Sequence, residues 1–358
     1  MTESPSLFDP MPLRGVIVPN RMWISPMCQY SSVDGFPSDW HLVHLGSLAR
    51  GGAGLVMTEA TAVTADGRIS PDDAGIWTDQ QAEAYGRITA FIAGQGAIPA
   101  IQLAHAGRKA STFAPWRGHG SVPADRGGWP TVGPSAVPFG DYARPAALSM
   151  AEIESIVVAF AAAAVRALEV GFEVIEIHAA HGYLVHEFLS PLSNRRTDRF
   201  GGTGRSQLLL DVVDAVRHAI ADQVPLLVRV SASDWAPGGL TVEEVAGVAA
   251  LLSGHGVDLI DVSSGGNAAD QQISLGPGYQ VPFARVIREV SGLPVSAVGL
   301  ITEPTQAQGY LAEGSADAIM LGRAALREPN WPLRAAEELG GEVRRPSQYL
   351  RARTEPAR

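Results

Sequence analysis

The sequence predicts an α/β protein folded as a (β/α)8 barrel, the TIM-barrel arrangement, on three observations. Short apolar runs alternate with longer stretches of helical periodicity about eight times along the 358 residues, which is typical of parallel strands joined by helices. The later strands recur at short, even intervals, as single-helix crossovers would give. One barrel with insertions can occupy a chain of this length. Because no composition shift or charge run marks a boundary, we expect a single domain over residues 1–358.

The expected elements follow in chain order, after a short N-terminal hairpin. The strands are expected at Met22–Met27, Gly54–Ala62, Ile98–His105, Val174–His178, Pro225–Ser231, Leu259–Ser263, Pro294–Val298 and Ala318–Gly322. Helical stretches between them are expected at Asp79–Ala93, Ala151–Glu169, Leu208–Ala221, Val242–Ser253 and Phe283–Val290.

One connection is much longer than the others. The stretch from Lys109 to Ser149, after the third strand, is rich in Pro, Gly, Trp and Ser and has no helical periodicity. A loop this long in a compact domain is usually a lid or a binding loop, and a disordered linker is the alternative. We expect an excursion over the mouth of the barrel.

Composition excludes several classes of protein. Hydrophobic residues make up 46% and charged residues 18%, with a formal net charge of −10, which fits a globular protein and disfavours binding to nucleic acid or to a membrane surface. The first residues do not resemble a signal peptide, and no run approaches the roughly 20 apolar residues that span a bilayer. We therefore expect a cytoplasmic protein. Cys28 is the one cysteine, so an internal disulfide and a thiolate zinc cluster are excluded.

Polar residues stand where the expected strands end. They are Ser25 to Tyr30, Glu59, Thr61, Gln102, His105, His178 to Tyr183, Arg229, Ser231 and Arg323. The carboxyl ends of barrel strands share one face, where catalytic residues of such barrels are found. The sequence therefore predicts a polar site on this rim.

His178, His181 and Tyr183 are the central candidates on the rim. Side chains alternate along a strand, so two histidines three positions apart converge only if the strand ends between them, and Gly182 eases such a bend. Two hydrogen-bonded surface histidines are one alternative, and a metal pair is another. No third ligand with a recognised spacing appears, and the sequence His-Glu-x-x-His is absent.

Two charged residues are expected inside the barrel. Arg229 and Glu176 would both point inward from neighbouring strands, where charges are tolerated when they are paired or meet a polar ligand. We predict that they pair. A polar cofactor edge would account for Arg229, and a purely structural ion pair is the alternative.

A phosphate position is expected at the last two strands. Gly299 and Gly322 follow these strands and Arg323 comes next, so exposed backbone amides and a guanidinium suit a phosphate monoester. No Gly-x-Gly-x-x-Gly and no Walker loop occurs, which disfavours a Rossmann nicotinamide site and a nucleotide triphosphatase.

Several long motifs in order resemble one family over almost the whole chain. They are Ser25 to Tyr30, Asp39 to Leu45, Gln102 with His105 to Lys109, Glu176 to Leu184, and Phe188 to Gly202. The chain resembles the old yellow enzymes, flavin-dependent ene-reductases, and within them the thermophilic-like branch, close to xenobiotic reductase A.

The resemblance implies tightly bound FMN that is reduced by NADPH or NADH and passes a hydride to the β-carbon of α,β-unsaturated carbonyl or nitro compounds. Because no separate dinucleotide site is expected, the two reactants would alternate in one pocket with ping-pong kinetics. The cofactor-binding residues implied are Ser25, Pro26, Met27, Cys28 and Ala60 at the isoalloxazine, Gln102 and Arg229 at the pyrimidine edge, and Gly299, Gly322 and Arg323 at the phosphate.

The resemblance also implies the substrate half of the site. His178 and His181 would donate hydrogen bonds to the substrate oxygen, Tyr183 would supply the proton, and Tyr30 would line the pocket. Arg351 would reach in from a neighbouring subunit, which implies a homodimer or homotetramer. The expected partners are small activated alkenes, with no metal, nucleic acid or membrane. Val298 stands where a tryptophan of the branch is expected, which suggests an altered pocket wall.

Three rival functions remain. A Schiff-base barrel such as an aldolase would need a lysine, and Lys109 is the only one in the chain. A metal-dependent hydrolase would use His178 and His181 as ligands. A non-catalytic binding barrel is the third, and the polar rim disfavours it.

Overall fold

The computed structural model describes residues 4–352 and contains a closed barrel of eight parallel strands. The strands follow one another around the barrel in chain order and the last, β12, pairs with the first, β3. They are β3 (Met22–Ile24), β4 (Leu55–Ala62), β5 (Ile98–Ala104), β8 (Val174–Ala179), β9 (Leu226–Ser231), β10 (Leu259–Ser263), β11 (Val295–Ala297) and β12 (Ala318–Leu321). The predicted fold class is confirmed.

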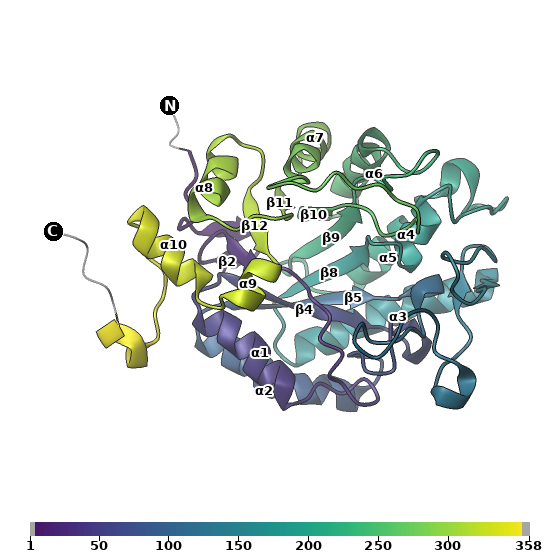
Figure 1. The fold of residues 1–358 in the computed structure, drawn as a ribbon, viewed down its shortest axis with the longest axis horizontal. Helices are drawn as coiled ribbons and strands as arrows, with labels where there is room; N and C mark the ends of the chain where they lie inside the picture. Colours follow the sequence, from purple (N-terminus) through teal and green to yellow (C-terminus); the bar gives the residue numbers. More distant parts are fainter. Residues whose placement is uncertain (1–3, 353–358) are drawn as a thin grey trace.

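Helices surround the strands (Figure 1), with α1 against β4, α2 against β5 and α7 against β10 and β11. The α-helices are α1 (Asp39–Arg50), α2 (Asp79–Gly94), α3 (Met150–Glu169), α4 (Leu184–Leu189), α5 (Gln207–Ala219), α6 (Val242–Gly254), α7 (Val281–Ser291), α8 (Pro304–Ala312), α9 (Arg323–Arg327) and α10 (Trp331–Leu339). The five predicted helices match α2, α3, α5, α6 and α7 to within two residues at each end.

Local sequence fixes several helix starts. Thr78, Ser149 and Thr241 each accept a hydrogen bond from the backbone three residues later, while the Gln or Glu at that position bonds back to the cap. This reciprocal capping satisfies backbone donors that a helix start otherwise leaves free. It explains why α2, α3 and α6 begin where the sequence predicted.

The first barrel strand is shorter than predicted. It ends at Ile24, although the apolar run continues to Met27. Ser25 still donates its amide to the carbonyl of Leu321 at 3.1 Å, but Pro26 has no amide hydrogen to continue the ladder. The chain therefore leaves the barrel wall here and runs along its rim.

The barrel interior has an apolar lower half and a polar upper half. The predicted hairpin is present, with β1 (Met11–Leu13) antiparallel to β2 (Val16–Val18), and it packs on inward residues from the beginnings of the strands, including Trp23, Val174 and Leu227. Buried polar residues occupy the strand ends, namely Gln102, Glu176, His178, Arg229, Asp261, Ser263 and Ser296. The division leaves the carboxyl-end face for chemistry.

The long excursion after β5 is tied to the body of the protein. It contains the 3-10 turns η2 (Gly107–Lys109) and η3 (Ala124–Arg126) and two short paired strands, β6 (Val132–Gly133) and β7 (Ala146–Ala147). The Arg196 guanidinium bonds two of its carbonyls, at 3.1 Å to Pro134 and 2.6 Å to Leu148. These contacts favour the binding-loop interpretation over the linker.

Three further 3-10 turns complete the chain: η1 (Ala65–Gly67), η4 (Gly202–Gly204) and η5 (Ser347–Ala352). The last is held to α1 by a 2.6 Å hydrogen bond from Arg50 to the Tyr349 hydroxyl. Between residues 4 and 352, no helix has both the length and the apolar character required to cross a membrane.

Candidate active site

The turn after β8 brings the predicted histidines and tyrosine together. β8 ends at Ala179, and His181 and Gly182 then adopt left-handed φ values of 58° and 72°. As a result, Nδ1 of His181 lies 3.3 Å from Nε2 of His178. The ring of Tyr183 stands edge-on to that of His178, with their centroids 5.0 Å apart. The predicted end of the strand between the two histidines is confirmed.

The turn depends on glycine and on its neighbours. A Cβ atom at Gly182 would stand 2.1 Å from the carbonyl oxygen of Gly266, so only glycine fits in this left-handed conformation. The amide of His181 donates to the Ser231 hydroxyl at 2.9 Å, and that hydroxyl donates to Gly265 at 2.8 Å. The end of β9 and the loop after β10 therefore hold the turn in place.

Both site histidines are neutral near pH 7. Burial, followed by the positive charge of Arg229, lowers the pKa of His178 and of His181 well below the ordinary value. Nδ1 of His178 accepts the Ala180 amide at 3.2 Å, so its proton is on Nε2, the nitrogen facing His181. Nε2 of His181 lies 2.7 Å from the Ser263 hydroxyl.

Tyr183 borders a cavity of about 350 Å³ under the excursion. The lining includes Tyr30, Lys109, Phe113 and Tyr142, and Tyr30 packs edge-on against Trp116 at 5.4 Å between centroids. Burial, with nearby ionisable groups, raises the pKa of Tyr183 well above its ordinary value. The phenol therefore keeps its proton while it faces this cavity.

The side chain of Lys109 forms hydrogen bonds with the backbone. Its ammonium donates at 2.8 Å to the carbonyl of His181 and at 2.8 Å to that of Gly266. Burial, followed by the charge of Arg108, lowers the pKa of Lys109 to about 8. A Schiff-base role needs an amine directed at substrate, and these two bonds argue against it.

The predicted pairing of Arg229 with Glu176 is wrong. Arg229 instead pairs with Asp261, with 3.0 Å between Nε and Oδ2. The strand registers explain the difference, because Arg229 is level with His178 on one side and with Asp261 on the other, while Glu176 is level with Leu227. Alternation along the predicted strand Leu259–Ser263 could have identified Asp261 as an inward residue.

Glu176 has a different partner. Its Oε1 accepts the Gln102 amide at 2.7 Å, and burial, followed by the charge of Asp261, raises its pKa to about 8. Among the described residues, Oε2 of Glu176 has no hydrogen-bond partner, although it is buried. A polar atom in this state fits a barrel mouth shaped for a polar ligand edge.

The segment after β3 is held against the same rim. Glu59 accepts the Gln29 amide at 3.0 Å and contacts Nε2 of the buried His41 at 2.9 Å. Cys28 and Tyr183 both pack on a small apolar cluster that contains Ala60. Burial, with the charges of Asp73 and Glu59, raises the pKa of Cys28, so its sulfur is a thiol at neutral pH.

The expected phosphate residues lie after β11 and β12. Gly299 has a φ of 126°, and the nearest atom to a Cβ built at Gly322 is Sδ of Met27, at 4.0 Å. Arg323 is exposed and opens α9. The open space at Gly322 and the exposed guanidinium beside it suit a phosphate, whereas a Cβ at Gly299 would lie 3.0 Å from the side chains of Gln280 and Tyr279.

Arg351 and Val298 are two further residues that the sequence singled out. Arg351 is exposed in η5, and a single chain does not test its placement in a neighbouring subunit. Val298 packs against the apolar interior of the barrel.

Sequence reasoning missed Ser263, His186 and Asp234, which contact the turn or its supports. Ser263 is inward by the same alternation as Asp261, whereas no sequence pattern pairs His186 with Asp234. Within residues 4–352, no group of three or more His, Cys, Asp or Glu side chains is arranged to hold a metal ion.

Comparisons with known proteins agree with one another. A family model described as "NADH:flavin oxidoreductase / NADH oxidase family" matches residues 6–342. An NADPH dehydrogenase of Geobacillus thermodenitrificans is 46% identical over 350 residues, which cover 96% of this chain and 98% of that protein. The structure of morphinone reductase in complex with tetrahydroNAD has a TM-score of 0.78 and 26% identity over 96% of this chain and 93% of that one.

An old yellow enzyme homologue from Zymomonas mobilis also has a TM-score of 0.78, at 28% identity over 95% of this chain and 94% of that one. A particular closeness to xenobiotic reductase A stays a prediction. The chain belongs to the NADH:flavin oxidoreductase / NADH oxidase family, the old yellow enzyme family, and is an FMN-dependent oxidoreductase with NAD(P)H as its reductant.

Proposed function

We propose that the protein is an ene-reductase that acts on α,β-unsaturated carbonyl or nitro compounds. The observation that carries the proposal is the meeting of two neutral imidazoles and a protonated phenol on one turn beside an open cavity. Neutral donors can bind an oxygen that gains negative charge, and a phenol can then release a proton to carbon.

The rim residues fit FMN. Among the described residues, the buried Oε2 of Glu176 has no hydrogen-bond partner, which supports a polar ligand edge at this position, and Gln102 lies beside Glu176. We propose that Gln102 and Arg229 bind the pyrimidine edge and that Gly299, Gly322 and Arg323 bind the phosphate. The residues proposed to contact the isoalloxazine are Ser25, Pro26, Met27, Cys28 and Ala60.

When bound, FMN would take a hydride from NAD(P)H and deliver it to the β-carbon of the alkene. His178 and His181 would hold the substrate oxygen, because the 3.3 Å contact between their rings is long enough to be exchanged for hydrogen bonds to that oxygen. Donors fixed before the reaction stabilise the charge that develops there.

Tyr183 would protonate the α-carbon. Its raised pKa keeps the proton on oxygen at neutral pH, and an enolate carbon is basic enough to take a proton from a phenol. Tyr30 and the excursion would cover the substrate and exclude water. The same cavity would receive NAD(P)H and alkene in turn, which gives ping-pong kinetics.

We further propose a homodimer or homotetramer in which Arg351 of one subunit reaches the site of another. A single FMN-binding domain over residues 1–358 and a cytoplasmic location stay predictions.

The test is spectroscopic. We expect the purified protein to be yellow, to be bleached by NADPH without oxygen, and to regain its colour on addition of 2-cyclohexenone, with parallel double-reciprocal plots. Colour that returns only with oxygen would contradict the ene-reductase. Intersecting plots would contradict the shared pocket. Loss of activity with a chelator would favour the metal-dependent rival.

A further inference from the structure

The left-handed turn that carries the site is held by a side chain behind it. The amide of Gly182 donates to Nδ1 of His186 at 2.8 Å. His186 lies in α4, directly after the turn, and is completely buried. The strained turn therefore donates one of its backbone hydrogen bonds to a histidine that does not line the substrate cavity.

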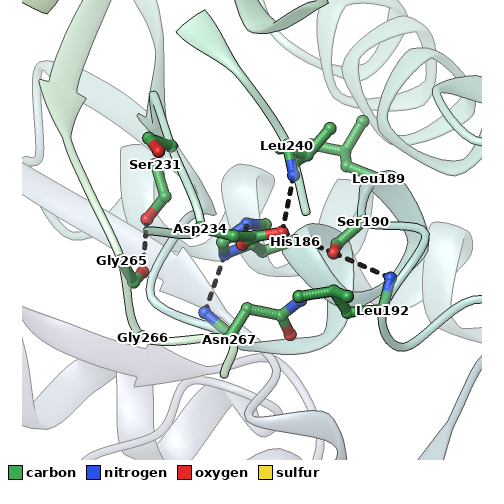
Figure 2. A network of polar contacts seen from close by, with 12 residues as sticks. His186, Leu189, Ser190, Leu192, Ser231, Asp234, Leu240, Gly265, Gly266 and Asn267 are labelled. Atoms are coloured by element: carbon green, nitrogen blue, oxygen red, sulfur yellow. Dashed lines mark hydrogen bonds and ion pairs between the residues drawn. The ribbon is translucent and has the colours of Figure 1, made fainter. Parts of the chain in front are cut away.

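His186 in turn faces a buried carboxylate. Figure 2 shows Asp234 beside it, with Nε2 of His186 3.0 Å from Oδ1 of Asp234. Asp234 lies in the loop after β9 and has no exposed surface. The other oxygen, Oδ2, accepts the Ser190 hydroxyl at 2.6 Å and the Leu240 amide at 2.9 Å.

These contacts fix where the protons are. Nδ1 of His186 accepts a proton from an amide, so the proton of the ring itself is on Nε2, which faces Asp234. Burial raises the pKa of the Asp234 carboxyl, but His186 and the hydrogen bonds from Ser190 and Leu240 outweigh it and hold that pKa below the ordinary value. Asp234 is therefore an anion that selects one tautomer of His186.

We propose that His186 and Asp234 form a buried positioning pair that holds the turn in its left-handed form and so places His181 and Tyr183 for proton transfer. The pair touches neither substrate nor cofactor. The pair acts through the backbone amide of Gly182. Gly182 stands between His181 and Tyr183 in the chain. This inference rests on the proposed function.

Asp234→Asn tests the tautomer directly. Ser190 and Leu240 both donate to Oδ2, so the amide oxygen must take that side and the NH2 group must face His186. Nε2 of His186 then has to accept a hydrogen bond from this NH2 group, so the ring proton moves to Nδ1. There it faces the amide proton of Gly182, and the hydrogen bond between Gly182 and His186 is lost. We expect ¹⁵N-histidine spectra to show this exchange, with the His186 signals assigned from the spectrum of His186→Asn.

The kinetic arm measures oxidation of the reduced holoenzyme by 2-cyclohexenone. We expect Asp234→Asn to slow it by about tenfold to a hundredfold, the usual cost of a small misplacement of catalytic groups. Asp214→Asn is the matched control, because Asp214 contacts His255 at 2.6 Å between α5 and the end of α6, outside the site. We expect it to leave the rate unchanged.

Two variants of His186 keep the proposal testable if Asp234→Asn fails to retain FMN. His186→Asn and His186→Leu both remove the contact with Asp234, but the asparagine oxygen can still accept the Gly182 amide. We expect His186→Asn to be at least fivefold faster than His186→Leu.

Equal rates for the two His186 variants, or an Asp234→Asn protein with the exchanged tautomer and a normal rate, would overturn the positioning role. A wild-type protein that does not reduce the alkene would instead reject the proposed function, and the spectra would still report the tautomer.

Discussion

At the scale of the residue, the environment and not the residue type decides what each group can do. His178 and His181 lie near Arg229, so burial and like charge keep them neutral. Lys109 is buried, and its ammonium donates hydrogen bonds to two backbone carbonyls. Neither state could be read from the sequence, because a pKa depends on neighbours that only the fold brings together.

Arg229→Lys should weaken the retention of FMN. Lysine keeps the charge opposite Asp261 but loses the planar set of donors, so we expect about a tenfold higher dissociation constant. Equilibrium dialysis of the apoprotein with FMN measures this. Arg288→Lys, at a surface pair with Asp317, is the control and should bind FMN normally. Equal affinities for the two variants would remove Arg229 from the cofactor site.

At the scale of the element, strand ends and turns were predictable where one residue decides them. Apolar runs and helical periodicity located the strands and helices, and Gly182 marked the bend. The register between β9 and β10 was not predictable, because it depends on how eight strands close together, so the pairing of Arg229 with Asp261 was missed although alternation marks Asp261 as inward. The same reason concealed the contact of His186 with Asp234, which joins α4 to a loop after β9.

Gly182→Ala should slow alkene reduction strongly while the barrel stays folded. The added Cβ would meet the Gly266 oxygen at 2.1 Å, so the turn must move. We expect a fall of about a hundredfold in the alkene step, measured by stopped-flow. Gly314→Ala is the matched control, since Gly314 has a φ of 69° and nothing within 4 Å of its Cβ position. A normal rate in Gly182→Ala would show that the turn tolerates displacement.

At the scale of the whole molecule, the barrel separates stability from chemistry. The hairpin and the beginnings of the strands form an apolar lower half, and buried charges gather at the strand ends. The fold class was predictable because short apolar runs alternate with helical stretches along the chain. The molecule therefore contains buried carboxyl groups, which lower its stability when they are charged. Burial is the largest cause that raises the pKa of Asp73, Glu176 and Glu187 to about 8.

The raised pKa values of these buried carboxyls predict how the stability of the protein changes with pH. A carboxyl with a raised pKa binds more protons when folded than when unfolded, so stability falls as pH rises towards 8 and then levels off. Glu187→Gln removes one such group and keeps an acceptor for the Arg108 amide. Between about pH 7 and 8.5, we expect the wild type to lose roughly 1 kcal/mol relative to this variant, measured by urea unfolding. Parallel curves would contradict the raised pKa of Glu187.

Tyr183 is proposed to supply the proton for alkene reduction beside FMN. The most direct measurement follows the two half-reactions of Tyr183→Phe separately without oxygen. We expect NADPH to bleach this variant at close to the wild-type rate, and 2-cyclohexenone to restore the colour about a hundredfold to ten-thousandfold more slowly. Tyr85→Phe, which loses a buried hydroxyl in α2 outside the cavity that Tyr183 borders, should behave as wild type. Restoration at the wild-type rate in Tyr183→Phe would contradict the account.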